Sequence, residues 1–156
     1  QKPSFVHANG IDILNNGLVD VAYLNLDYEN KMIANFHLNW FSPVKIRRII
    51  IGGSKKMILF DDVEATEKIK VYNSGINIKK DQQKIHELQI SYRTGDMYSP
   101  KISNLEALKV EIDEFVKSIQ NKLNNKNNNS LVDGKDVVQI LEKAKISLEK
   151  NDRVKV

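Results

Sequence analysis

The sequence predicts an α+β domain in which helices pack on one face of a mostly antiparallel, open β-sheet. Three observations predict this class. Short strand-like segments fill roughly the first two-thirds of the chain, the connections between them are short, and apolar residues recur at helical spacing from Asn104 onward. Strands first and helices last favour an antiparallel sheet with helices on one side of it.

The strongest strand prediction is a hairpin between Val19 and Trp40. Val19 to Tyr28 alternates with period two, as in a half-buried strand. Glu29-Asn30-Lys31 reverses the chain, because Asn30 can adopt a left-handed conformation. The residues expected on the buried faces are Ala22, Leu24, Leu26 and Tyr28 in the first strand and Ala34, Phe36, Leu38 and Trp40 in the second.

Further short strands are predicted with antiparallel pairing. They are expected at Phe5 to Asn9, Ile46 to Ile51, Met57 to Phe60, Lys68 to Tyr72 and Glu87 to Tyr92. Asn73-Ser74-Gly75 is a turn signal, and the lysine-rich stretch from Ile78 to Lys84 is expected to be a loop.

Two amphipathic helices are predicted at the end of the chain. The first is capped by Asn104 and has Leu105, Leu108, Ile112, Phe115, Ile119 and Leu123 on its apolar face. Asn124 to Ser130 is an asparagine-rich linker. Asp133 or Asp136 then caps a second helix, whose expected buried stripe is Val137, Leu141, Ala144 and Leu148.

Composition limits the classes of function. The 156 residues are expected to form one domain, and the net charge of +4 comes from 24 basic and 20 acidic residues that are interspersed, which favours a solvated surface over a nucleic-acid site. The absence of cysteine excludes disulfides, thiol catalysis and cysteine-ligated metals, and the three histidines lack metal-ligand spacing. Since the sequence has neither a membrane-length apolar run nor a secretory signal, we expect no membrane partner and a cytoplasmic location.

One face of the predicted sheet carries more apolar residues than a solvated face normally does. These residues are Val21, Tyr23, Ile33, Phe41, Ile49, Ile51 and Phe60. Exposed apolar patches mark partner sites, so the pattern predicts a homo-oligomer formed through the open sheet face. The alternative is that loops or the N-terminal segment cover these residues.

The segment from Trp40 to Gly53 is the best candidate for a functional edge. It places Trp40, Lys45 and Arg47 at a junction between strands, where binding groups are commonly carried. Gly52-Gly53 is followed by a strand-like run, whereas a nucleotide-binding loop leads into a helix, so we expect no phosphate-cradling loop. Trp40 is equally compatible with a core position.

A second candidate segment runs from Tyr92 to Lys101. It includes Arg93 and Tyr98 and could hold a polar ligand, although it could also be a simple turn from sheet to helix. The pair Asp61-Asp62 is less promising for acid–base chemistry, because adjacent residues on a strand point to opposite faces.

The order of these segments resembles the C-terminal domain of the Gfo/Idh/MocA oxidoreductases, an open antiparallel sheet of the dihydrodipicolinate-reductase type. The resemblance runs from Asp20-Val21-Ala22 through the pattern Trp40-x-x-Pro43-x-Lys45-x-Arg47 to Asp61-Asp62, and continues in Tyr92-Arg93-x-Gly95-Asp96, Ser99-Pro100-Lys101 and Glu106-x-Leu108. Its closest similarity is to the branch that oxidises nucleotide-linked or N-acetylated sugars.

The resemblance implies a division of labour. In the family, an N-terminal Rossmann domain holds NAD or NADP and a catalytic lysine, and a histidine motif lies near the start of the second domain. We expect residues 1–156 to be a single C-terminal domain without these parts, an excised domain or split-gene product that is inactive alone, binds no cofactor alone and contains no catalytic residue. Its expected role is to bind a sugar or nucleotide sugar, through Trp40, Lys45, Arg47, Arg93 and Tyr98 as ligand-facing or interface groups, and to form the oligomer. The alternative is a stand-alone, non-catalytic binding or scaffold module of the same fold.

Overall fold

The computed structural model describes residues 2–29, 32–79, 89–103, 105–120 and 131–156, with the side chains of 76–93 left undescribed. The chain divides into two compact units. Unit 1 comprises Gln1–Pro43 and Val110–Val156, and unit 2 comprises Val44–Lys109. Each unit carries a four-stranded antiparallel sheet of its own.

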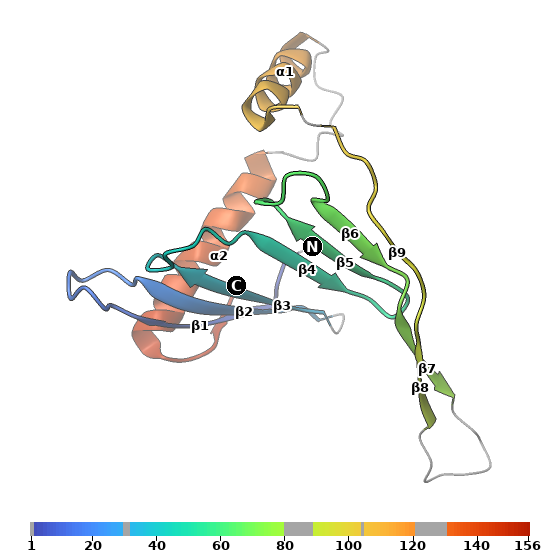
Figure 1. Ribbon diagram of the computed structural model, residues 1–156. Coiled ribbons are helices and arrows are strands. Elements are labelled where there is room, and N and C mark those ends of the chain that lie inside the picture. Colours follow the sequence, from blue (N-terminus) through green and yellow to red (C-terminus); the bar gives the residue numbers. More distant parts are fainter. Residues whose placement is uncertain (1, 30–31, 80–88, 104, 121–130) are drawn as a thin grey trace. The chain divides into compact units, whose positions relative to one another are not determined.

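Unit 1 is a sheet with a helix packed on one face. Its strand order is β10-β1-β2-β3, formed by β1 (Phe5–Ile11), β2 (Val21–Asp27), β3 (Ile33–Asn39) and β10 (Val154–Lys155). The long helix α2 (Leu131–Lys150) runs along this sheet (Figure 1) and contacts β1 and β10. The predicted hairpin is confirmed, because β2 and β3 pair in register from Val21 opposite Asn39 to Asp27 opposite Ile33.

The core of unit 1 lies between α2 and the central strands. It consists of Val6, Ala8, Leu24, Leu26 and Ala144, with Tyr28, Ala34, Ile140 and Leu148 packed around it. The predicted alternation of β2 is thereby confirmed. The prediction that β3 buries Phe36, Leu38 and Trp40 is wrong, since all three are exposed. The reason is that α2 covers β1 and β10, and β3 lies at the other edge of the sheet.

A buried serine fastens α2 to β1. The Ser147 hydroxyl accepts a hydrogen bond from the Ala8 N–H at 2.9 Å and donates one to the Asp152 carbonyl at 2.6 Å. Asn151, with φ of 50°, ends α2 in the left-handed conformation typical of such positions and turns the chain toward β10.

The predicted buried stripe of α2 is partly wrong: Ala144 is buried and Leu148 packs on the core, but Val137 and Leu141 are exposed.

Unit 2 has the sheet order β4-β5-β6-β9 and a separate two-stranded ribbon. The sheet is formed by β4 (Arg48–Gly52), β5 (Met57–Asp61), β6 (Ile69–Tyr72) and β9 (Met97–Tyr98), and the ribbon by β7 (Gly75–Lys79) and β8 (Gln89–Arg93). All pairings are antiparallel, which confirms the α+β class. The strands of the described chain form three sheets instead of one broad sheet.

Three strands were not predicted: β7, β9 and β10. Two of them are only two residues long, too short to show a period in sequence. The predicted loop at Ile78 to Lys84 begins inside β7, and its remainder lies outside the described residues.

The first predicted helix is present as α1 (Ala107–Gln120), and no residue of it is buried. Its predicted cap, Asn104, and its predicted last turn at Leu123 lie outside the described residues. None of the described helices is both long enough and apolar enough to cross a membrane.

Candidate functional site

The cations of the predicted functional edge stand at one end of the sheet of unit 2, and the two arginines are paired with aspartates. Arg48 Nε lies 2.6 Å from Asp61 Oδ2, across the β4–β5 pair in which these residues are direct neighbours. Arg47 Nη1 lies 3.4 Å from Asp62 Oδ2, and the Asp62 N–H donates to the Arg47 carbonyl. Lys45 precedes them on an exposed stretch.

Asp61 is held by its surroundings more firmly than Asp62. The hydrogen bond from Arg48 holds the pKa of the Asp61 carboxyl below its ordinary value, against the opposing effect of partial burial. Its other oxygen, Oδ1, accepts from the Val63 N–H at 3.1 Å, which fixes the turn after β5. Asp61 is therefore the last residue of β5 and is engaged as an ion-pair partner.

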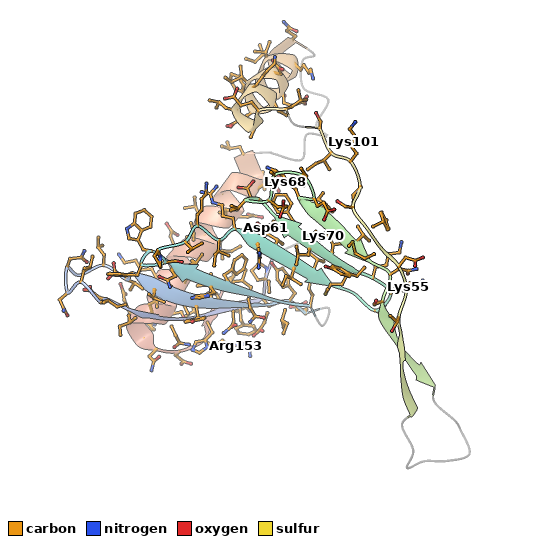
Figure 2. All side chains as sticks on the ribbon, viewed as in Figure 1. Lys55, Asp61, Lys68, Lys70, Lys101 and Arg153 are labelled. Atoms are coloured by element: carbon orange, nitrogen blue, oxygen red, sulfur yellow. The ribbon has the colours of Figure 1, made fainter. Side chains whose placement is uncertain are left out.

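An open cleft of about 500 Å³ borders this end of the sheet. Its polar lining includes Asp62, Glu64, Lys68 and Ser103. Lys68 Nζ lies 3.8 Å from Asp62 Oδ1, and Figure 2 shows Lys68 and Asp61 toward the same end of the sheet. Two carboxylates beside one lysine make the cleft a poor site for phosphate, because the excess negative charge of Asp62 and Glu64 would repel an anion.

The remaining predicted residues do not all gather at this end. Trp40 belongs to unit 1, follows β3 and is 86% exposed. Its backbone N–H donates a hydrogen bond to the Asp20 carbonyl. Tyr98 is half exposed and lies opposite Val71 of β6. The cross-strand row of paired residues that contains Tyr98 and Val71 reaches β4 at Ile51. Arg47 is four residues from Ile51, so Arg47 and Tyr98 are separated by about 13 Å along the strand and by three strand spacings across the sheet.

The segment from Tyr92 to Lys101 is built into the framework of unit 2. Arg93 ends β8 opposite Gly75, with its side chain outside the described residues. Gly95 lies so close to the Asn73 backbone that a Cβ atom would clash with it, and the Asn73 N–H donates to the Asp96 carbonyl. Ser99 donates its hydroxyl to the Ile69 carbonyl at 2.8 Å. These contacts give the segment a structural role, whatever Tyr98 contacts in addition.

A polar surface that the sequence analysis missed covers the outward face of unit 1, opposite α2. Its cross-strand rows include His7 with Asn25 and Asn35, and Asn9 with Tyr23 and His37. The rings of Tyr23 and His37 stack at 4.6 Å between centroids. The alternation of β1, β2 and β3 contained the signal, but the prediction considered only the apolar members of this face.

The described residues do not fit a dinucleotide. Gly52 and Gly53 connect β4 to β5, two antiparallel strands, and the Gly53 N–H is bound to the Lys56 carbonyl at 3.0 Å. A pyrophosphate loop instead leads from a strand into the N-terminus of a helix. No cluster of three or more His, Asp or Glu side chains in the described part of the chain is placed to hold a metal ion.

Solved structures share this fold at low sequence identity. The UDP-N-acetylglucosamine 3-dehydrogenase GnnA from Acidithiobacillus ferrooxidans matches 96% of the chain with 41% of its own length, at a TM-score of 0.69 and 17% identity. The chain has the fold of the Gfo/Idh/MocA C-terminal domain. A levoglucosan dehydrogenase, solved with NADH and levoglucosan, matches 99% of the chain with 45% of its own length, at a TM-score of 0.70 and 13% identity. An NAD-binding protein from Listeria innocua matches 99% with 46% of its length, at a TM-score of 0.57 and 16% identity.

The chain thus spans less than half the length of each of these proteins. No protein-family model matches the chain, and no curated protein matches it significantly in sequence. The likeness is therefore one of fold, and it confirms the fold expected from the resemblance of the sequence segments.

Proposed function

We propose that this chain is the substrate-binding and oligomerisation domain of an NAD(P)-dependent sugar or nucleotide-sugar dehydrogenase. The observation that carries the proposal is the match of nearly the whole chain to a minor part of two sugar-related dehydrogenases. The turn at Gly52-Gly53 connects two antiparallel strands, which agrees with a cofactor held by a part of the protein outside residues 1–156.

In this proposal, the residues of this chain bind the substrate, and the cofactor held elsewhere in the protein takes part in the hydride transfer. When bound, the nicotinamide accepts or donates the hydride, and an acid–base group within hydrogen-bond reach of the substrate hydroxyl moves the proton. The residues of this chain bind and orient the substrate. Lys45 and Arg47 are proposed to face a nucleotide-sugar phosphate, with Trp40, Arg93 and Tyr98 as further ligand-facing or interface groups.

Both cations, Lys45 and Arg47, can contribute to binding a phosphate. Arg47 is held by Asp62 at 3.4 Å, a loose and exposed ion pair that a phosphate could replace. Lys45 is exposed beside it and would add a second positive charge for the same anion. The proposal therefore predicts that the two residues act together.

The second part of the proposed function is oligomerisation. One face of the unit 2 sheet, called here the aliphatic face, carries Ile49, Ile51, Ile58, Phe60, Ile69, Val71 and Tyr98. Ile49 and Ile51 are each more than half exposed. Apolar patches of this kind mark protein contacts, and we propose a second copy of this chain as the partner.

Titration of the chain with a panel of nucleotide sugars and their free sugars tests the binding role. We expect binding of at least one nucleotide sugar and an affinity about tenfold weaker in the K45A/R47A double variant, because charge-assisted hydrogen bonds to the phosphate are lost. Lys145→Ala, an exposed lysine on α2, is the matched control and should leave the affinity unchanged. Failure of every nucleotide sugar to bind would contradict the proposal.

The coding sequence upstream of Gln1 separates the dehydrogenase from a stand-alone module of the same fold. An in-frame Gly-x-Gly-x-x-Gly segment between a strand and a helix is expected for the dehydrogenase. A stop codon followed by a local start codon would favour the module.

A further inference from the structure

A cleft of about 300 Å³ opens on the outward face of unit 1. Its lining residues are His7, Asn25, Asp27, Ile33, Asn35 and Arg153, all within one compact unit. Its volume is at the lower end of the range of small-ligand sites. Ile33 belongs to the apolar set that the sequence assigned to an oligomer face, and the other five residues lie outside the two candidate binding segments.

The sheet register explains how the cleft is assembled. His7, Asn25 and Asn35 are direct neighbours on β1, β2 and β3. Since Val154 of β10 lies opposite Val6, the preceding residue, Arg153, comes level with His7. The end of the chain thus extends the polar row across a fourth strand.

Arg153 is held in place from two sides. Its Nη2 lies 3.1 Å from Asp27 Oδ2, and its guanidinium carbon lies 3.8 Å from the centroid of the Phe5 ring. A guanidinium that is stacked on a ring and paired with a carboxylate is pre-organised, so little side-chain entropy is lost when a ligand binds its remaining N–H groups. Figure 2 labels Arg153 beside the sheet of unit 1.

Asn25 and Asn35 are hydrogen-bonded to each other and keep further hydrogen-bonding groups for a ligand. The Asn35 amide donates to the Asn25 carbonyl oxygen. An asparagine side chain has two N–H donors and one carbonyl acceptor, so this bond leaves the Asn25 amide group as a donor and the Asn35 oxygen as an acceptor for a ligand. The lining therefore offers donors and acceptors side by side.

The charge and the apolar neighbours narrow the class of ligand. The formal charges of Asp27 and Arg153 cancel, and the Asp27 carboxylate would repel an anion. Hydroxyl groups both donate and accept, which suits a mixed lining. Ile33 supplies an apolar wall, and the stacked Tyr23 and His37 rings lie on the same face one row beyond Asn25.

We propose that this cleft binds an uncharged sugar ring through Asn25, Asn35 and Arg153. The inference takes its ligand class from the proposed function and adds the place where the sugar is held. Asn25 and Asn35 contact neighbouring hydroxyls, Arg153 donates to a third oxygen, and Ile33 contacts the C–H face of the ring.

Amide-resolved NMR titration of the chain with N-acetylglucosamine, with levoglucosan and with a nucleotide sugar tests the inference. The side-chain amide signals of Asn25 and Asn35 report directly on the cleft. We expect them to shift with at least one sugar, and the affinity to fall about tenfold in the N25A/N35A double variant, through the loss of two hydrogen bonds. Asn9→Ala, on the same face but outside the cleft, should change the affinity less than twofold.

The other outcomes separate the two proposals. A sugar that binds while the Asn25 and Asn35 signals stay fixed, with shifts around Lys45 instead, would overturn this inference and leave the proposed function intact. Absence of binding by every sugar and nucleotide sugar would overturn both. A well-dispersed spectrum of the double variant establishes that it is folded, and Arg153→Lys, which keeps the charge but loses the planar fork, should weaken binding independently.

Discussion

The two sheets differ in what covers them. In unit 1, α2 packs on the sheet and five residues, Val6, Ala8, Leu24, Leu26 and Ala144, form a buried core. In unit 2, three consecutive isoleucines on β4 are all more than half exposed, and among its described residues Val71 is the buried hydrophobic one. Large apolar residues thus occur in the strands of both units. Burial depends on an element that packs against the sheet, and in unit 1 this element is α2, which belongs to the same unit.

The remaining faces of the two sheets differ in chemistry as well. The outward face of unit 1 carries amide, imidazole and ion-paired groups that suit a polar ligand. The aliphatic face of unit 2 carries branched side chains that suit a protein partner. This difference agrees with the two proposals, in which one sheet binds a sugar and the other forms the contact between copies of the chain.

Truncation in the core of unit 1 should have the largest effect on stability. Leu26 is 5% exposed, and Leu26→Ala should lower the free energy of unfolding by about 2 to 5 kcal/mol, through lost burial and a residual cavity. Leu38→Ala, on the same face of the sheet but 53% exposed, is the matched control and should cost less than about 1 kcal/mol. Urea denaturation followed by circular dichroism measures both, and equal losses would mean that Leu38 is also covered.

Removal of the buried hydroxyl should have an intermediate effect. Ser147→Ala leaves the Ala8 N–H without its acceptor at a buried position, which should cost about 1 to 3 kcal/mol. Ser118→Ala removes a similar hydroxyl from α1, where Ser118 donates to the Glu114 carbonyl, and should change stability by less than about 0.5 kcal/mol. A Ser147 variant as stable as the parent would show that α2 is not fastened to β1 in this way.

The smallest effect is expected at the exposed ion pair of unit 2. The hydrogen bond from Arg48 lowers the pKa of Asp61 in the folded chain below the ordinary value of 3.8. The pair therefore stabilises the fold above that ordinary value, and its contribution is lost as the pH falls through the lower, folded-state pKa. Arg48→Gln should raise the pKa of Asp61, as measured by NMR titration of its carboxyl carbon. An unchanged titration would show that the pair does not form in solution.

Much of the framework could be predicted from the sequence. Period-two alternation gave the hairpin from Val21 to Asn39, and the apolar spacing after Asn104 gave both helices. These signals are local, because strand and helix periods are read from neighbouring residues. The aspartate pairing of Arg47 and Arg48 and the place of Arg153 beside His7 depend on long-range strand register, which periodicity does not encode.

The burial of Ser147 was not predicted and that of Trp40 was predicted wrongly, for the same physical reason. Ser147 occupies a core position, but a serine carries no apolar signal. Trp40 is apolar and was compatible with a core position, yet it follows the last residue of β3 and is almost fully exposed. Residue type alone therefore misjudged burial in both directions, because burial is decided by the element packed opposite.

Sedimentation equilibrium of three variants of β4 tests whether the aliphatic face of unit 2 forms the contact between two copies of the chain. Ile49 and Ile51 lie on the aliphatic face, and Ile50, between them and 64% exposed, lies on the opposite face. We predict that the parent chain self-associates, that Ile49→Asp and Ile51→Asp yield monomers, and that Ile50→Asp keeps the parent mass. A parent chain that is already monomeric, or an assembly that survives aspartate at both Ile49 and Ile51, would contradict it.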